Sequence, residues 1–256
     1  KLAHISEIII ISSGSTDKTN SIAARFAKQY PFISLIKQHK RLGKASAVNL
    51  FIAQAKEEIV VLSSADILLA QNTLEKIVKP FRKKQTGIVG SHPVPLNDPT
   101  TFFGFSAHLL WKLHHQISLH TPKMGECIAF RKVFRSIVES TVVDEANIEA
   151  IITAQGYQSV YADEAIIYNK GTETLKEFVT RRSTIYAGHL ATKHEHGYEV
   201  ATFNHGKIMW LLLKQTEISW RFLLWTPIVI VLEGYSRLLG LIKYKTNIQL
   251  QPVWEI

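Results

Sequence analysis

A carboxylate that could do chemistry, Asp66, comes just after an apolar stretch of this chain. The stretch 59–62 reads Ile-Val-Val-Leu, without alternation of polar and apolar residues. Such a run is typical of a strand buried on both faces of a parallel sheet, and open α/β sheets bind ligands at the carboxyl ends of their strands. Asp66 is therefore either a ligand-binding carboxylate or the cap of the helix expected over 72–81.

Two further segments form a candidate diphosphate site. The segment 12–19, Ser-Ser-Gly-Ser-Thr-Asp-Lys-Thr, follows the strand expected over 5–11, and 43–49, Gly-Lys-Ala-Ser-Ala-Val-Asn, begins a helix. A helix amino terminus presents free N–H groups and a partial positive charge, to which Lys44 adds a full charge. The oxygen atoms of a diphosphate suit such a site. The glycine spacing fits neither a Walker loop nor a dinucleotide fingerprint.

Two pairs of adjacent charged residues complete the candidates. Asp144 and Glu145 precede a stretch expected to be helical. Adjacent carboxylates repel each other, so in a dry site one of them would have a raised pKa and could act as a base near neutrality. The alternative is an acidic pair that complements the helix dipole. Arg181 and Arg182 lie on a later expected helix, where they either bind an anion or form a solvated face.

The elements that must position these residues alternate between strand and helix. Strands are expected over 5–11, 33–37, 59–62, 87–90, 128–130 and 160–161. Helices are expected up to residue 29 and over 43–55, 72–81, 102–119, 145–155 and 175–189. This alternation predicts an α/β fold with a right-handed, Rossmann-like and mostly parallel sheet. The prolines in 91–95 predict a loop after the fourth strand.

The charge and cysteine content narrow the range of partners. Lys and Arg number 30 against 21 Asp and Glu, a formal net charge of +9 for 256 residues, which favours nucleotide phosphates or an anionic membrane surface. Nucleic acid is the least favoured partner, because the basic residues are scattered and no helix-turn-helix, zinc-finger or RNP pattern occurs. With Cys127 as the single cysteine, no internal disulfide can form, which is typical of a cytosol-facing protein.

The carboxyl-terminal part differs in composition from the rest. Residues 222–242 are apolar apart from a few side chains, and about 20 such residues can cross a bilayer. Glu233 and Arg237 lie four residues apart and can pair on one helix face. We predict a transmembrane or re-entrant helix in preference to a soluble core helix, and a division into a domain over 1–190 and a membrane-associated helical segment over 191–256.

Five motifs in order resemble those of the inverting family 2 glycosyltransferases, which have the GT-A nucleotide-diphospho-sugar fold. That family runs E-I-I-V-V-D-D-G-S-T-D-x-T, G-K-A-x-A-L-N, D-A-D, G-x-x-x-A-F-R, an E-D pair before G-Y, and Q-R-x-R-W. The corresponding stretches here are 7–19, 43–49, Ser64-Ala65-Asp66, 125–131, Asp144-Glu145 before Gly156-Tyr157, and 181–185. The resemblance extends over about residues 5–190. The family's first strand is not found in this chain, and we expect an upstream piece to be missing.

The resemblance implies roles for the candidate residues. Asp66 would ligate a divalent cation, Mg²⁺ or Mn²⁺, that bridges the two phosphates of a UDP- or GDP-sugar. Glu145, with Asp144 beside it, would be the general base that deprotonates an acceptor hydroxyl. The remaining residues expected to contact the donor are Ser13, Gly14, Ser15, Asp17, Lys44, Asn49, Arg181 and Arg182.

The chain departs from the family pattern at several acidic positions. Ser12 and Ser13 replace the D-D pair, and Ser64 replaces the first Asp of D-A-D. The expected activity is transfer of a sugar to a hydroxyl acceptor, lipid-linked or membrane-delivered, at an active site on the cytosolic side of a membrane. The alternatives are a non-catalytic sugar-nucleotide-binding or scaffold protein of the same fold and a nucleotidyltransferase with a similar sheet.

Overall fold

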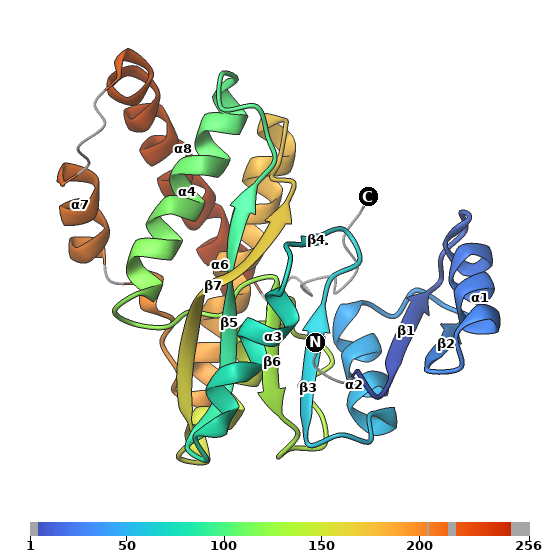
Figure 1. Cartoon of the computed structure of the whole chain (residues 1–256). Coiled ribbons are helices and arrows are strands. Elements are labelled where there is room, and N and C mark those ends of the chain that lie inside the picture. Colours follow the sequence, from blue (N-terminus) through green and yellow to red (C-terminus); the bar gives the residue numbers. More distant parts are fainter. Residues whose placement is uncertain (1–4, 204, 215–218, 247–256) are drawn as a thin grey trace.

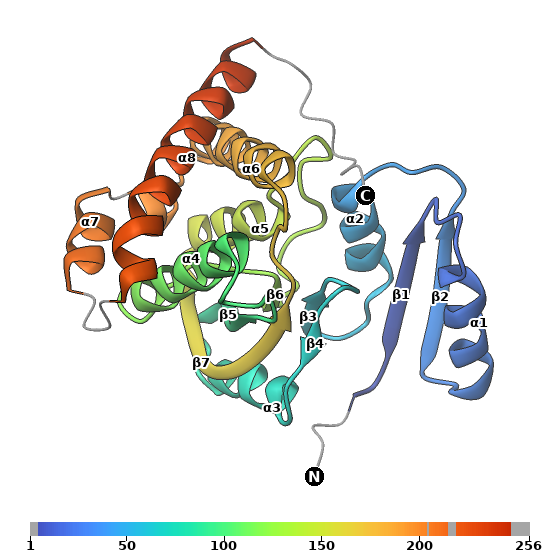
Figure 2. The same ribbon diagram turned by 90° about the horizontal axis from the view of Figure 1, so that it is seen from above.

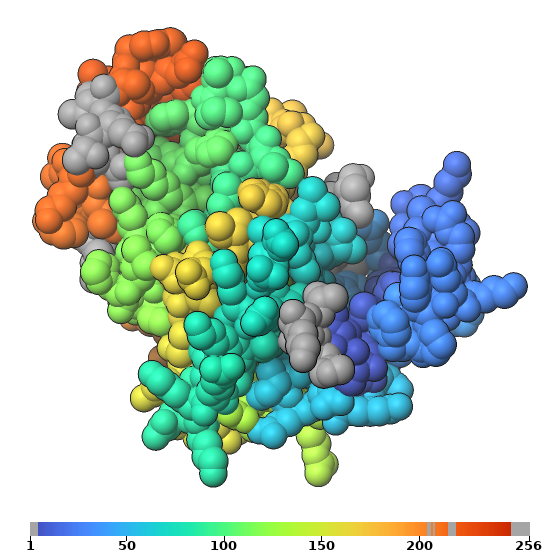
Figure 3. Space-filling model, viewed as in Figure 1, coloured from blue at the N-terminus to red at the C-terminus, as the bar shows by residue number. Residues whose placement is uncertain are grey.

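An amino-terminal lobe carries the first four elements. The computed structural model describes residues 5–203, 205–214 and 219–246 (Figure 1). Strands β1 (Ile8–Ser13) and β2 (Ile33–Gln38) form a two-stranded parallel sheet, which the helices α1 (Thr19–Gln29) and α2 (Lys44–Gln54) accompany. Strands β1 and β2 and helix α1, drawn in blue, project from one side of the molecule (Figure 3), whereas α2 packs into the central core.

A five-stranded sheet forms the centre of the rest of the chain. Its order is β3, β6, β5, β7, β4, with the bounds Ile59–Ser63, Cys127–Arg131, Thr86–Pro95, Gln158–Asn169 and Leu68–Leu69. Only β5 and β7 are parallel neighbours, whereas the other three pairs are antiparallel. The predicted mostly parallel sheet was therefore wrong, and the sheet is mixed. An apolar run such as β6 shows that a strand is buried on both faces, but it carries no information on the direction of that strand.

The loop predicted from the prolines of 91–95 was also wrong. Strand β5 continues to Pro95 and pairs there with the end of β7. Strand β6 pairs with β5 only over Ile88–Gly90, so the other edge of β5 beyond Gly90 has no strand partner among the described residues. Proline, which lacks an N–H group, is tolerated on such an edge, and Pro93 and Pro95 lie there.

Helices cover both faces of the central sheet (Figure 2). Those after β3 are α3 (Thr73–Val78), α4 (Phe102–Ser118), α5 (Asp144–Ala154), α6 (Leu175–His196), α7 (His205–Leu213) and α8 (Trp220–Lys245). Neighbouring strand residues alternate between the two faces: Val89 and Ala129 pack with α3, while Ile128 and Phe130 pack with α2 and α5. The first turn of α5 is thereby held against the sheet.

Helix α8 packs closely along α6, as Figure 2 shows. A Cβ added at Gly240 of α8 would lie 2.6 Å from the Ser183 carbonyl oxygen of α6, so only glycine permits this approach. Lys243 Nζ donates to Ser183 Oγ at 2.8 Å. Helix α6 runs without interruption through residue 190, so the predicted division of the chain after that residue would cut a continuous helix.

Candidate functional site

Two carboxylates and one ammonium group form the densest cluster of charge. Asp144 and Glu145 occupy the first turn of α5, where carboxylates complement the helix dipole. Lys44, in the first turn of α2, donates from Nζ to Glu145 Oε1 at 2.6 Å and lies 3.1 Å from Asp144 Oδ2. The side chains of Asp144 and Glu145 are only 5% and 19% exposed. Three residues predicted for the site therefore converge, although about a hundred residues separate Lys44 from the carboxylates.

The surroundings drive the pKa values of the two carboxyls apart. Burial and the negative charge of Glu145 raise the pKa of Asp144 to about 7, against the opposing effect of Lys44. Burial also opposes ionisation of Glu145, but its ion pair and hydrogen bond with Lys44 outweigh burial and lower its pKa. The pair can thus hold one proton near neutrality, which is the property required of a base that works at that pH.

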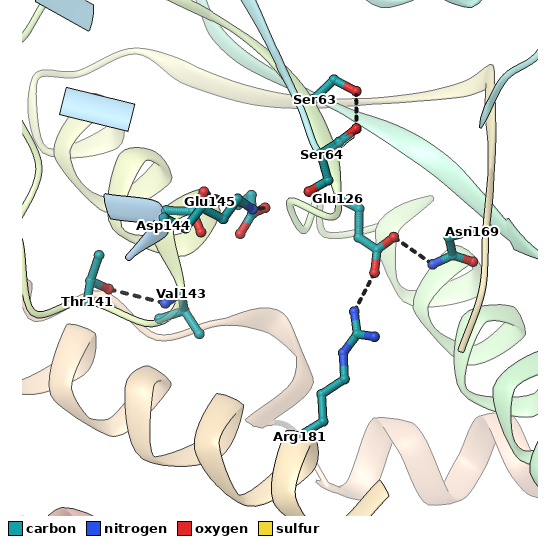
Figure 4. A network of polar contacts seen from close by, with 10 residues as sticks. Ser63, Ser64, Glu126, Thr141, Val143, Asp144, Glu145, Asn169 and Arg181 are labelled. Atoms are coloured by element: carbon teal, nitrogen blue, oxygen red, sulfur yellow. Dashed lines mark hydrogen bonds and ion pairs between the residues drawn. The ribbon is translucent and has the colours of Figure 1, made fainter. Parts of the chain in front are cut away.

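A second charged group lies opposite this pair. The antiparallel register aligns Ser63 at the end of β3 with Cys127 at the start of β6, so Glu126 comes beside the residues that follow β3. Glu126 Oε1 accepts from Arg181 Nη2 at 2.7 Å, and its Oε2 accepts from Asn169 Nδ2 at 2.8 Å. In Figure 4 the Glu126 carboxylate is turned toward Arg181 and Asn169, and Asp144 and Glu145 lie on the other side of the view.

The negative charges of Asp66 and Glu145 contribute to the pKa of Glu126. Burial raises the pKa of Glu126, Arg181 opposes that shift, and the negative charges of Glu145 and Asp66 add to it. Asp66 itself is exposed, four residues beyond Leu62 of β3 and thus at the sheet edge expected from the sequence. The sequence interpretation assigned no role to Glu126. A carboxylate directly before a buried strand was visible, but its position beside Asp66 depends on the direction of β6.

The turn after β1 is built by its own side chains. Ser12 Oγ donates to Ser15 Oγ at 2.8 Å, and Ser13 Oγ accepts from the Leu42 N–H at 3.2 Å. Gly14 has a φ of +64°, and a Cβ there would lie 2.7 Å from the Arg41 backbone nitrogen. The turn is therefore fixed against the segment that leads into α2 and Lys44.

Three other predicted site residues are engaged elsewhere in the structure. Asp17 Oδ1 accepts from the Thr19 N–H at 3.0 Å and so holds the turn that leads into α1. Asn49 exchanges two hydrogen bonds with the backbone of Ile137, at 2.8 and 3.1 Å, which secures the segment before α5. Arg182 donates from Nε and Nη2 to the two carboxylate oxygens of Glu233 on α8, each at 2.7 Å. Arg181 lies at the carboxylate cluster, whereas Arg182 joins α6 to α8.

The oxygen-rich donor set fits a hard divalent cation that arrives with its ligand. No three His, Cys, Asp or Glu side chains within the described ranges converge on a common metal position. Mg²⁺ is commonly held by one or two carboxylates together with substrate phosphates, so a preformed cage is not needed. The exposed carboxylate of Asp66, at the edge of the sheet, is suited to that kind of binding.

Comparison with curated proteins finds partial matches. A dolichyl-phosphate beta-glucosyltransferase, ALG5A of Trichomonas vaginalis, is 33% identical over 90 residues, which is 33% of this chain and 28% of the relative. ALG5C of the same organism is 24% identical over 181 residues, 64% of this chain and 53% of the relative. A beta-monoglucosyldiacylglycerol synthase of Nostoc is 32% identical over 85 residues, 32% of this chain and 18% of the relative. The matches thus span about half or less of these relatives.

A solved structure and a family profile extend the comparison. A mannosyltransferase of Pyrobaculum calidifontis, solved with GDP-Man and Mn²⁺, superposes with a TM-score of 0.64 over 94% of this chain and 78% of that chain, at 20% identity. The architecture is therefore the GT-A fold with a mixed sheet. The profile described as Glycosyl transferase family 2 matches residues 4–141, more than half of the sequence. With the fold and this match in agreement, the chain belongs to glycosyl transferase family 2.

Proposed function

We propose that this chain is the catalytic part of an inverting glycosyltransferase that moves a sugar from a nucleotide-diphospho-sugar to a hydroxyl acceptor. The observation that carries the proposal is the convergence of Lys44, Asp144 and Glu145 opposite Glu126 and Arg181. The charge of Glu145 affects the pKa of Glu126, so the buried base and the cationic Arg181 lie in one neighbourhood, as in-line displacement of a diphosphate would need. The relatives named above carry glucosyltransferase and synthase names, which supports this chemistry.

The base in our proposal is the Asp144–Glu145 pair. Glu145 corresponds to the family's base position and is held ionised by Lys44, while Asp144 keeps its proton up to about pH 7. Withdrawal of Lys44 toward the donor phosphates would leave Glu145 free to accept the acceptor's hydroxyl proton. Lys44 would thereby link donor binding to exposure of the base.

The donor side in our proposal is formed by Asp66 and Arg181. A divalent cation, Mg²⁺ or Mn²⁺, held by Asp66 would supply neutralisation of the charge that grows on the departing diphosphate. Arg181 keeps an exposed fraction of 41% and can exchange Glu126 for a phosphate oxygen. The turn of Ser13, Gly14 and Ser15 would contact the nucleotide at the entrance to α2.

The acceptor in our proposal is delivered by a membrane. In α8, the described helix that meets the length and hydropathy expected of a membrane span, only 17% of the most apolar window is buried. However, α8 packs along the polar helix α6 and forms an ion pair with it between Glu233 and Arg182. If α8 crossed the membrane, it would carry α6 into the hydrocarbon core. We therefore propose that α8 lies along the membrane surface. The active site would face the cytosol, in agreement with the buried free thiol of Cys127.

Release of nucleoside diphosphate by membranes carrying the full-length protein tests the proposal. UDP- and GDP-sugars are offered with Mn²⁺, Mg²⁺ or a chelator. Loss of a general base costs about 10²-fold or more, so Glu145→Gln should reduce release to that extent. Asp66→Asn, which removes the proposed metal ligand, should also reduce release, and Glu139→Gln, an exposed control, should not. Full release by both Glu145→Gln and Asp144→Asn would contradict the assignment of the base.

A non-catalytic sugar-nucleotide-binding protein is the second candidate. Lys44 contacts both carboxylates in the structure, and Ser64 stands where the family has the first aspartate of D-A-D, next but one to the proposed metal ligand Asp66. This alternative predicts that nucleotide sugars bind without release and that a chelator leaves their affinity unchanged. Calorimetric titration of the same donor panel, with and without chelator, separates it from the transferase.

A further inference from the structure

A cationic pocket lies between α6 and α8, and its lining includes neither Asp144 nor Glu145. Arg182 and His189 of α6 line it together with Glu233 and Arg237 of α8. Lys123, from the segment between α4 and β6, closes the pocket. Figure 2 shows α6 and α8 side by side. Helix α8 therefore contributes both to this pocket and to the exposed apolar surface of the protein.

The charges around the pocket are unbalanced. Glu233 accepts from Arg182 at 2.7 Å and from Arg237 at 2.9 Å, so a single carboxylate serves two guanidinium groups. Lys123 adds a third cation. Burial and the nearby Arg182 lower the pKa of Lys123 to about 8, which keeps most of its charge at neutral pH. Glu149, the other carboxylate near Lys123, has a pKa raised to about 7 by burial and compensates only in part.

One buried polar atom at the pocket, Nδ1 of His189, lacks a hydrogen-bond partner among the described residues, and Lys123 interacts with Glu149 and Glu233 through charge. His189 is 8% exposed. Burial of an unpaired polar atom is costly, so His189 Nδ1, with Lys123 in the lining of the same pocket, suits a ligand with oxygen acceptors.

We propose that the pocket formed by Lys123, Arg182, His189 and Arg237 binds a phosphate group of an anionic lipid. The cavity of about 20 Å³ admits one oxygen-sized group, so one phosphate oxygen enters between Lys123 and His189 while the ester remains outside. One wall of the pocket is α8, whose Leu224, Val231 and Leu238 are 56–69% exposed. The choice of a lipid rests on the membrane association proposed above, whereas anion binding by the pocket does not.

Binding measurements on the full-length protein, without turnover, test the proposal. The ligands are inorganic phosphate, phosphatidylcholine vesicles with or without phosphatidic acid, and UDP or GDP. Lys123→Met removes one charged hydrogen bond and is expected to weaken binding of phosphate and of phosphatidic acid vesicles about tenfold. Lys123→Arg should retain that binding. Lys176→Met, which removes the same charge from an exposed position of α6, should bind as the wild type does.

Three results would overturn the proposal. If phosphate binds wild type and Lys123→Met equally, it binds outside this pocket. If Lys123→Met and Lys176→Met lose vesicle binding to the same extent, the effect is one of net charge. If Lys123→Met weakens UDP or GDP binding and leaves vesicle binding unchanged, the phosphate site belongs to the donor. Absence of sugar transfer with phosphate binding intact would reject the proposed function alone.

Discussion

Lys44 shares one ammonium group between two carboxylates, so the three side chains titrate as a unit. The shared cation separates the two carboxyls, leaving Glu145 ionised and Asp144 with a pKa of about 7. Without this cation, two adjacent buried carboxylates would both resist ionisation, because burial and mutual repulsion act in the same direction. Lys44 therefore determines which protonation state the pair has at neutral pH.

Replacement of Lys44 tests this view through the pH dependence of kcat/KM for nucleoside diphosphate release. A base must be deprotonated, and Lys44 lowers the pKa of Glu145, so activity in the wild type should persist through neutrality and be low only in acid, rising at a pH below the ordinary range of a glutamate. Lys44→Met removes the charge that favours ionisation and should move this rise upward by roughly one pH unit or more. Lys28→Met, an exposed change on α1, should leave it in place. An unmoved profile in Lys44→Met would contradict the coupling.

Glu126 provides a second test at the level of residues. Glu126→Gln keeps the size of the side chain and its bond to Asn169 but removes the charge that orients Arg181. We expect kcat/KM to fall about tenfold or more, since hydrogen bonds to charged groups contribute roughly 1.5–3 kcal/mol. Glu173→Gln breaks a surface ion pair between Glu173, which is 58% exposed, and Lys170, which is 63% exposed. This control variant should retain full activity. Equal activity of both variants would exclude Glu126 from the site.

At the level of elements, periodicity predicted where strands and helices occur but not how they are joined. The helix over 43–55 and the strand over 59–62 were confirmed, because their apolar patterns are local properties. The reversed direction of β6 and the continuation of β5 through Pro95 depend on pairing with β7 and β3. The convergence of Glu126 with Asp66, and the bond of Arg182 to Glu233, required this long-range information.

Close packing of α6 against α8 leads to a prediction on stability. Gly240→Ala puts a Cβ 2.6 Å from the Ser183 carbonyl oxygen, and overpacking of this kind costs about 1–3 kcal/mol of the free energy of unfolding. Gly234→Ala lies on the same helix with no atom within 4 Å of the new Cβ, and should stabilise by up to about 1 kcal/mol through helix propensity. Denaturant titration of both variants measures the difference. Opposite signs are expected, and destabilisation of equal size in both would contradict a close contact between the two helices.

At the level of the whole molecule, the apolar side chains are distributed unevenly over the surface. Residues 224, 228, 231, 235, 238 and 242 of α8 are large, apolar and 45–69% exposed, and they recur at spacings of three and four residues on one helical face. The opposite face of α8 holds Glu233 and Gly240 against α6. With a net charge of +9, the chain thus combines an apolar stripe with an excess of cations, which favours an anionic bilayer surface.

Vesicle binding by variants tests whether the apolar stripe of α8, rather than exposed apolar residues elsewhere, contacts a membrane. Val231→Glu and Leu238→Glu introduce charges at positions that are 69% and 56% exposed, so both variants should fold. Their binding to phosphatidylglycerol-containing vesicles should weaken tenfold or more, which corresponds to a loss of about 1.4 kcal/mol or more. Phe26→Glu and Phe32→Glu, 40% and 43% exposed on the amino-terminal lobe, are the matched controls and should bind as the wild type does. Added salt should weaken vesicle binding by the wild type in part. Screening reduces the attraction of the protein to anionic lipid, whereas the apolar contact of α8 with the bilayer remains. Equal losses in both pairs of variants would mean that net charge, rather than the apolar face of α8, holds the molecule on the membrane.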